Sequence, residues 1–230
     1  MRAWPAPWSG HVHFIGIGGV GMSSLAALLA GRGVRVTGSD QAVYPPASEA
    51  LQRAGIEVGT PYAAEHLDPA PDLVVVGNAI SRGNEEVEVA LERHLALASL
   101  PALIERWMVP GRTVSVVAGT HGKTTTASLL AWLHAATGRD PSYFIGGLPG
   151  NFELGAAWGG GPDLVLEGDE YDTAFFDKGP KFLHYWPHIA IVGGVEFDHA
   201  DIYADLEAVK RVFSLLGRLV PPNGALVLPA

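Results

Sequence analysis

The chain has 230 residues, which is enough for one large domain or two small ones with a buried core. Its composition is that of a globular protein, with 48% hydrophobic and 17% charged residues, and its formal net charge of -9 argues against binding to nucleic acid or to an anionic membrane. The sequence contains no cysteine, which excludes disulfides, thiolate zinc sites and thiol catalysis. The first ten residues hold no apolar signal-peptide core, so we expect a cytoplasmic protein without membrane insertion.

A strand, a glycine turn and a helix are predicted within Val12–Ala30. This stretch is apolar enough to resemble a membrane span, but its glycines interrupt the run and favour the strand-turn-helix interpretation. The pattern Gly16-x-Gly18-x-x-Gly21 lies in the turn, and Asp40 ends the next strand about 20 residues further on. Such a turn places a pyrophosphate on the helix end and a carboxylate near a ribose hydroxyl. The pattern therefore indicates a nucleotide-type ligand, and it suits a UDP-sugar as well as NAD.

The unit of apolar strand, glycine turn and helix recurs along the chain, which predicts an α/β fold with parallel sheets. In the first half, Asp72–Asn78 is predicted as a strand and Glu85–His94 as a helix. Arg106–Arg112 contains a Pro-Gly pair and is predicted as a linker, so we expect two domains, residues 1–109 and 110–230.

In the second half, strands are predicted at "TVSVVAG", "DLVLEG", "IAIVGG" and "GALVLP", and a helix over Leu206–Leu219 with Asp205 as its cap. No covering helix follows the last predicted strand, so we expect the second domain to be incomplete.

The segment "VVAGTHGKTTTASLLAWL" predicts a buried strand, a glycine turn and a helix that opens with Lys123. Unpaired amide groups at a helix N-terminus and the helix dipole favour a phosphate there. Lys123 adds an ammonium group and Thr124 a hydroxyl for Mg²⁺. The generic phosphate-loop pattern has glycine five residues before Gly122, where this chain has Val117, so the match is partial.

Two acidic clusters follow predicted strands, at the ends where ligands of α/β proteins bind. Their members are Glu167, Asp169, Glu170, Asp172 and Asp177 in the first cluster, and Glu196, Asp198, His199 and Asp201 in the second. Converging on the phosphate loop, the two clusters would form a site for ATP and Mg²⁺, which prefers oxygen ligands and substrate phosphates. His11 and His13 flank one residue of the first strand, and we expect ordinary strand-edge side chains there.

The sequence resembles the Mur ligase family of ATP-dependent, amide-forming enzymes of peptidoglycan synthesis. The matching segments cover nearly the whole chain in the family's order, namely "GIGGVGMSSLA", "TGSD", "AGTHGKTTT", "EGDEYD" and "EFDHAD". Segments such as "GNAISRGN" and "VEFDHADIY" are similar to the branch that joins L-alanyl-γ-D-glutamyl-meso-diaminopimelate to UDP-N-acetylmuramate in recycling. The branch that adds free L-alanine is the near alternative.

The resemblance implies a Rossmann-like UDP-sugar-binding domain over residues 1–109, a truncated P-loop-type ATPase domain over 110–230, and the absence of a C-terminal domain. It implies ATP and Mg²⁺ as cofactors, Lys123, Glu167 and His199 as catalytic residues, and Thr124, Glu167 and His199 at the metal. The implied ATP-binding residues are Gly119, Thr120, His121, Gly122, Lys123, Thr124, Thr125 and Asn151. The implied UDP-sugar-binding residues are Gly16, Gly18, Gly19, Gly21, Ser39, Asp40 and Asn78.

In the implied reaction the muramate carboxylate attacks the γ-phosphate of ATP, and the amine of a peptide then displaces phosphate from the acyl phosphate. Lys123 and Mg²⁺ act by neutralising and positioning the phosphoryl group. Gly193 and Gly194 stand where the family usually has asparagines, and we expect the loss of the asparagine amide to weaken the ATP side of the site. We expect this chain alone not to complete a turnover. The rival interpretations are a non-catalytic UDP-sugar-binding module and an NAD-dependent oxidoreductase.

Overall fold

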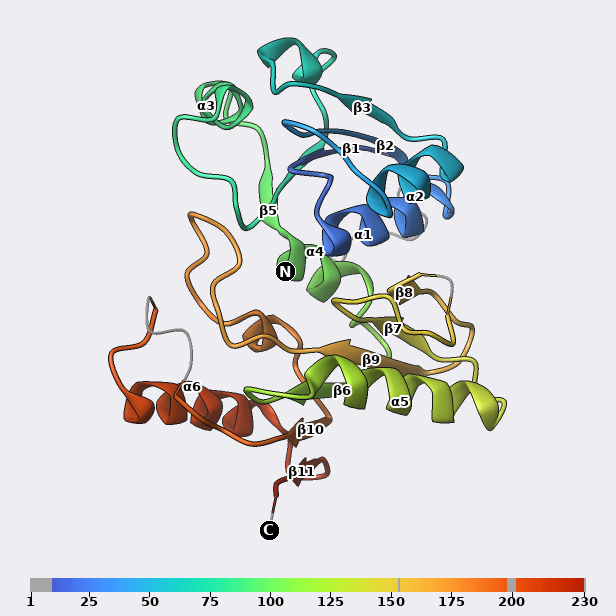
Figure 1. Cartoon of the computed structure of the whole chain (residues 1–230), viewed down its shortest axis with the longest axis vertical. Coiled ribbons are helices and arrows are strands. Elements are labelled where there is room, and N and C mark those ends of the chain that lie inside the picture. The colour runs from blue at the N-terminus through green and yellow to red at the C-terminus, as the bar shows by residue number, and fades with distance from the viewer. Residues whose placement is uncertain (1–9, 153, 198–201, 230) are drawn as a thin grey trace. The chain divides into compact units, whose positions relative to one another are not determined.

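The chain packs as two compact units, and the computed structural model describes residues 10–152, 154–197 and 202–229 (Figure 1). Unit 1 runs to Leu103 and also takes in Thr173–Asp177, whereas unit 2 contains Ile104–Asp172 and the chain from Lys178 onward. The limit between the units lies inside helix α4 (Leu100–Trp107), a few residues before the boundary predicted from the sequence.

Unit 1 is a five-stranded parallel sheet with the strand order β3-β2-β1-β4-β5. Its elements are β1 (His11–Ile15), α1 (Val20–Ala30), β2 (Arg35–Ser39), α2 (Ala47–Arg53), β3 (Glu57–Gly59), the 3-10 helix η1 (Ala64–Leu67), β4 (Leu73–Val76), α3 (Glu85–Glu92) and β5 (Leu97–Ser99). This order and the parallel pairing are those of a Rossmann-like domain, as the sequence predicts.

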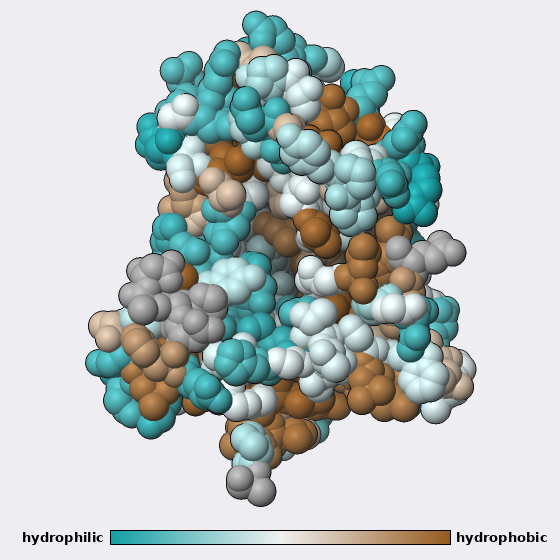
Figure 2. Space-filling view, in the orientation of Figure 1, coloured by the Kyte–Doolittle hydropathy of each residue, from teal (hydrophilic) through white to brown (hydrophobic). Residues whose placement is uncertain are grey.

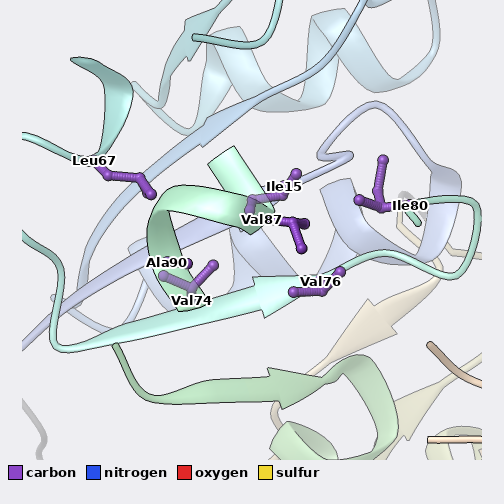
Figure 3. Packing of buried hydrophobic residues seen from close by; sticks show 7 residues of the cluster. All are labelled: Ile15, Leu67, Val74, Val76, Ile80, Val87 and Ala90. Atoms are coloured by element: carbon purple, nitrogen blue, oxygen red, sulfur yellow. The ribbon is translucent and has the colours of Figure 1, made fainter. Parts of the chain in front are cut away.

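One part of the core of unit 1 lies between the central strands and α3. All four residues of β4 are buried, which is typical of a parallel strand covered on both faces. Figure 3 shows Val87 and Ala90 of α3 against Ile15 of β1 and Val74 of β4, all four of them at most 1% exposed. Phe175, from the segment Thr173–Asp177, also packs against this cluster.

Unit 2 contains a six-stranded sheet with the order β11-β10-β6-β9-β7-β8. Strands β7 and β8 pair antiparallel, and the other neighbours pair parallel. The elements are β6 (Thr113–Ala118), α5 (Lys123–Ala136), β7 (Ser142–Phe144), β8 (Ala156–Ala157), β9 (Asp163–Glu167), the 3-10 helix η2 (Lys181–His184), β10 (Ile189–Val192), α6 (Leu206–Leu219) and β11 (Ala225–Val227).

Helix α6 and strand β11 occupy the end of the described chain. The predicted helix over Leu206–Leu219 is confirmed, and the Asp205 side chain caps it by accepting from Ala208 N at 2.7 Å. β11 is an edge strand whose three residues are exposed, and Figure 2 shows apolar surface around β10 and β11. Across residues 10–152, 154–197 and 202–229, no helix has both the length and the apolar character needed to cross a bilayer.

Two expectations about local structure need correction. The predicted linker is too long at its start, because α4 runs to Trp107, and only residues 108–112 form a turn, in which Gly111 has a φ of 75°. His11 and His13 are not edge residues, since β1 is the central strand and the two side chains are 9% and 1% exposed. A pair of buried histidines needs hydrogen-bond partners, and both contact the Thr37 hydroxyl, at 2.7 and 2.8 Å.

Candidate nucleotide-binding sites

The glycine turn of unit 1 is fixed to the end of β2 by backbone hydrogen bonds. Gly16, with a φ of 83°, ends the apolar run of β1, and its amide and that of Ile17 both donate to the Ser39 carbonyl, at 2.8 and 3.0 Å. The left-handed conformation at Gly16 favours glycine. The turn therefore lies at the carboxyl ends of β1 and β2, the edge of a parallel sheet where ligands bind.

Asp40 binds the middle of this turn through its side chain. Its Oδ2 accepts from Gly18 N at 2.8 Å, and its Oδ1 accepts from the Tyr62 hydroxyl at 3.2 Å. A Cβ on residue 18 would lie 2.8 Å from Asp40 Oδ2, so any residue other than glycine would displace the carboxylate from its present position. Burial and the Asp40 charge raise the pKa of Tyr62 to about 12.

The remaining residues predicted for this site lie along the same edge. Gly19 is the N-cap of α1 and Gly21 lies in its first turn. Asn78 is exposed and follows β4, the neighbour of β1 in the sheet. Ser39 is fully buried, and its hydroxyl donates to Glu86, so Ser39 contributes its carbonyl to the turn.

Tyr62 belongs to the surroundings of the site but was not predicted from the sequence. It lies in the segment before η1, more than 20 positions from Asp40 in the chain. No local pattern around Tyr62 indicates this contact, because it depends on how β3 and η1 pack beside β2.

The phosphate loop of unit 2 joins β6 to α5, as the sequence predicts. Gly119 and Gly122 have φ values of 131° and 75°, and a Cβ on residue 119 would lie 2.9 Å from Gly193 N. Gly122 is the N-cap of α5 and has no side chain to cap the helix. The first amide groups of α5 therefore suit an anion at this end of the helix.

Lys123 opens α5, and its ammonium contacts the carbonyls of Gly119 and Thr120 and the carboxylate of Glu170. Its Nζ lies 2.9 Å from the Gly119 carbonyl and 3.0 Å from Glu170 Oε2, and the Glu170 side chain is 3% exposed. Tyr203 donates its hydroxyl to the Glu170 backbone carbonyl. Glu170 is thus the counter-ion of the phosphate-loop lysine, a role that the acidic cluster alone did not assign to it.

Thr124 and Glu167 place two oxygen groups beside the loop. Thr124 Oγ1 donates to Glu167 Oε1 at 2.6 Å, and Gly146 N donates to Glu167 Oε2 at 2.7 Å. A hydroxyl and a carboxylate at the start of a phosphate-binding helix are ligands that fit Mg²⁺. Among the described residues no group of three or more histidine, aspartate and glutamate side chains is arranged to hold a metal, and the predicted ligand His199 lies outside these residues.

Other predicted ATP-binding residues differ in their surroundings. Thr120 is 8% exposed, and its hydroxyl oxygen accepts from Glu196 N at 2.9 Å. The His121 side chain is 73% exposed, with Nε2 3.8 Å from Glu196 Oε2. Thr125 and Asn151 are both exposed, the former on α5 and the latter in the loop between β7 and β8.

The first acidic cluster does not converge as a whole on the loop. Glu167 and Glu170 contact loop residues, whereas Asp169 pairs with Lys181 at 2.7 Å. Asp177 lies in unit 1, where its Oδ2 accepts from Ser99 Oγ at 2.7 Å. Of the second cluster, Asp198 and Asp201 lie outside the described residues, as His199 does.

The chain is a two-unit α/β protein with a glycine turn of the nucleotide-binding type at the carboxyl ends of parallel strands in each unit. Residues 11–110 match the family model described as Mur ligase family, catalytic domain. The solved structure of the UDP-N-acetylmuramate:L-alanyl-gamma-D-glutamyl-meso-diaminopimelate ligase from Neisseria meningitides is similar to this chain. The two are 43% identical, with a TM-score of 0.91 over 97% of this chain and 72% of that one. The chain belongs to the Mur ligase family.

Two curated relatives represent two branches of that family. The UDP-N-acetylmuramate--L-alanyl-gamma-D-glutamyl-meso-2,6-diaminoheptandioate ligase of Escherichia coli (strain K12) is 47% identical over 95% of this chain and 48% of its own length. The UDP-N-acetylmuramate--L-alanine ligase of Arthrobacter sp. (strain FB24) is 42% identical over 95% of this chain and 44% of its own length. The chain thus spans about half the length of the curated relatives it matches.

Proposed function

We propose that this chain binds UDP-N-acetylmuramate in unit 1 and ATP with Mg²⁺ in unit 2, and that it serves an ATP-dependent ligase. The reaction joins the muramate carboxylate to the amine of L-alanyl-γ-D-glutamyl-meso-diaminopimelate. The observation that carries the proposal is the convergence of Lys123, Thr124 and Glu167 at the glycine loop that opens α5. The branch assignment is supported by the names of the relatives from Escherichia coli and Neisseria meningitides.

In this proposal the residues of unit 2 bind and orient the triphosphate. The ammonium of Lys123 and the first amides of α5 offset phosphate charge and fix the position of the γ-phosphate. Thr124 and Glu167 would hold Mg²⁺, which when bound adds positive charge next to the phosphates. Because no side chain need form a covalent bond, the contribution of the chain is alignment and electrostatic stabilisation.

In unit 1 the glycine turn and Asp40 would bind the nucleotide part of the UDP-sugar. The amide groups of the turn suit the pyrophosphate, and the carboxylate suits a ribose hydroxyl. Gly18 N currently donates to Asp40, so a pyrophosphate would compete with that carboxylate for the amide. The cytoplasmic location expected from the sequence belongs to this proposal, because ATP and a UDP-sugar are its substrates.

Calorimetry of the 230-residue chain tests the two binding steps. We expect saturable binding of UDP-N-acetylmuramate, and binding of ATP that depends on Mg²⁺. Binding of the UDP-sugar without Mg²⁺-dependent ATP binding would instead support the non-catalytic module. Binding of NADH but not of UDP-N-acetylmuramate would support the oxidoreductase and overturn the proposal.

The acceptor is tested with an ADP-release assay in which the tripeptide or L-alanine is the amine. For the ligase as a whole we expect release with the tripeptide, and preferential release with L-alanine would move the assignment to the second branch. We also propose that the 230-residue chain alone does not complete a turnover of the ligase reaction. Sustained ADP release by the 230-residue chain would contradict that part.

A further inference from the structure

A fully buried carboxylate lies behind the glycine turn of unit 1. Glu86 is the second residue of α3, and its side chain is 0% exposed. Asn84 caps this helix by accepting from Glu86 N at 3.0 Å and from Val87 N at 3.2 Å. Because an ionised carboxylate is costly to bury, Glu86 must have donors that compensate for lost water.

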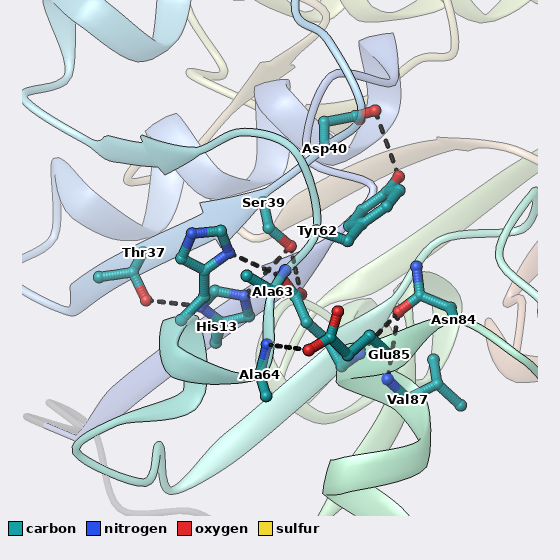
Figure 4. A network of polar contacts seen from close by, with 12 residues as sticks. His13, Thr37, Ser39, Asp40, Tyr62, Ala63, Ala64, Asn84, Glu85 and Val87 are labelled. Carbon is teal, nitrogen blue, oxygen red and sulfur yellow. Dashed lines mark hydrogen bonds and ion pairs between the residues drawn. The ribbon is translucent and has the colours of Figure 1, made fainter.

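Four donors from four segments of unit 1 meet this carboxylate. Its Oε1 accepts from Ala63 N at 3.1 Å and lies 2.8 Å from His66 Nδ1. Its Oε2 accepts from the Ser39 hydroxyl and lies 3.4 Å from His13 Nε2. Figure 4 shows His13, Ser39 and Ala63 converging in this network. Glu86 therefore joins β1, β2, η1 and the segment before η1 to the start of α3.

The donors keep Glu86 ionised. Burial by itself raises the pKa of Glu86, but the hydrogen bonds from His13, Ser39 and His66 outweigh burial and hold the pKa below its ordinary value of 4.5. An ionised carboxylate only accepts hydrogen bonds, so the hydroxyl proton of Ser39 is committed to Glu86.

Two of the segments that Glu86 holds also hold the glycine turn. Ser39 accepts the two amides that open the turn, and the next residue, Asp40, accepts the Gly18 amide. Ala63 directly follows Tyr62, which donates to Asp40. The residue before Asp40 and the segment that donates to its side chain are therefore both hydrogen-bonded to Glu86.

We propose that Glu86 is a positioning residue of the UDP-sugar site, acting through Ser39 and Ala63 without touching the ligand. It fixes the spacing between the Ser39 carbonyl, the Asp40 carboxylate and the amides of the glycine turn. This inference rests on the proposed function of unit 1, that is, on UDP-N-acetylmuramate being its ligand.

Glu86→Gln in the 230-residue chain tests the inference, with Glu85→Gln as the matched control. Glu85 is the neighbouring acid on the same helix turn, it is exposed, and it accepts from Ala64 N at 3.2 Å. The amide of glutamine keeps the shape but offers one acceptor oxygen and no charge. By calorimetry we expect about tenfold weaker binding of UDP-N-acetylmuramate to the Glu86→Gln variant. The control should bind like the parent chain.

Backbone amide proton shifts separate positioning from a general loss of stability. In ¹⁵N-labelled chain, the Gly16, Ile17 and Gly18 amides should move upfield in the Glu86→Gln variant, because their hydrogen bonds lengthen, and stay in place in the Glu85→Gln variant. A merely structural role would lower the free energy of unfolding without moving these three signals.

Ser39→Ala is a second variant for the case in which Glu86→Gln does not fold. It removes one donor and leaves Glu86 with the other three, and the same amides should move. Unchanged amide shifts and unchanged affinity in whichever variant folds would overturn the positioning role. Failure of the parent chain to bind UDP-N-acetylmuramate would overturn the proposed function instead, and the amide shifts would still decide whether Glu86 positions the turn.

Discussion

Lys123 forms an ion pair with Glu170 of its own unit. A bound triphosphate would have to compete with Glu170 for the lysine ammonium. The Lys123 side chain is 11% exposed, and that of its partner Glu170 is 3% exposed. At such low exposure the attraction between the two charges is weakly screened. We therefore expect loss of one partner to destabilise unit 2, and we expect the pair to lower the affinity of the loop for anions.

Glu170→Gln separates these two effects. We expect the free energy of unfolding to fall by about 2 kcal/mol, because a buried charge loses its counter-ion while the lysine keeps the Gly119 carbonyl. We also expect ATP to bind several-fold more tightly, because the phosphates no longer compete with a carboxylate. Urea unfolding and calorimetry measure the two quantities.

Glu207→Gln is the control for this prediction, since Glu207 is an exposed acid paired with Lys210 at 2.8 Å on α6. It should change neither quantity by a measurable amount. A Glu170→Gln variant with parent-like ATP affinity would show that Glu170 does not compete with phosphate.

The long helices and strands are predicted from sequence patterns within a few residues. The N-cap of α6 allows the contribution of one such pattern to stability to be measured. Asp205 is the N-cap, and its carboxylate satisfies the amide of Ala208. We expect Asp205→Ala to lower the free energy of unfolding by about 1 kcal/mol, whereas Asp205→Asn keeps a cap and most of that stability. Equal loss in both variants, measured by urea unfolding, would argue that the charge of Asp205 matters rather than its hydrogen bond.

An ion pair at the start of β9 predicts a dependence of stability on pH. Arg139 donates to both carboxylate oxygens of Asp163, at 2.7 and 3.0 Å, and holds the pKa of Asp163 below its ordinary 3.8 despite burial. A carboxyl whose pKa is lowered by folding stabilises the protein above its unfolded-state pKa, and this contribution is lost as the pH falls through the folded-state value.

Asp163→Asn should therefore be less stable than the parent chain at neutral pH, and the difference should shrink as the pH falls below 3.8. Urea unfolding at a series of pH values measures it. Arg139 is about half exposed, so solvent screening limits the size of the effect. Asp68→Asn is the control, because Asp68 is an exposed partner of Arg93. A constant difference across the pH series would contradict the prediction.

How far the sequence predicts each element depends on its length and on where its partners lie. β1, β4, β6 and α6 carry apolar runs or a capped helical pattern, and all four were predicted. Strands β3, β5, β7 and β8 have two or three residues each and are defined by their neighbours in the sheet, so no local pattern indicates them.

Site residues divide in the same way. Both glycine turns, Lys123 and Thr124 were predicted because short motifs encode them, whereas the resemblance to the Mur ligase family implied a metal-associated role for Glu167. Tyr62 and the partners of Glu86 were missed, because contacts between residues 20 to 73 positions apart depend on the folded sheet. The same reason explains Asp177, which belongs to the first acidic cluster in sequence but packs in unit 1.

Each of the two units builds its candidate site from its own residues. In unit 1 the site contacts join Gly18, Asp40 and Tyr62, and in unit 2 they join Lys123 and Glu170. Since these sets share no member, we expect the two ligands to be lost independently when one site is damaged.

Gly18→Ala and Lys123→Ala test this independence. A Cβ at position 18 would displace Asp40, so the first variant should lose at least about tenfold in affinity for UDP-N-acetylmuramate and keep its affinity for ATP. The second should lose the stabilisation by ATP and Mg²⁺ and keep that by the UDP-sugar, because it lacks the ammonium that binds the phosphates. Thermal unfolding with each ligand measures both, since a ligand that binds the folded chain raises its melting temperature.

The double variant and a glycine control complete the experiment. Gly31→Ala places a methyl group at the end of α1, 3.4 Å from the Ala27 carbonyl and away from the turn, and should bind both ligands like the parent chain. In the double variant the loss of affinity for UDP-N-acetylmuramate and the loss of affinity for ATP should each equal the loss in the single variant, as expected for sites without shared partners. If Lys123→Ala lowered the affinity for the UDP-sugar as strongly as the affinity for ATP, the two sites would be coupled. The assignment of one ligand to each unit would then have to be replaced by a shared site.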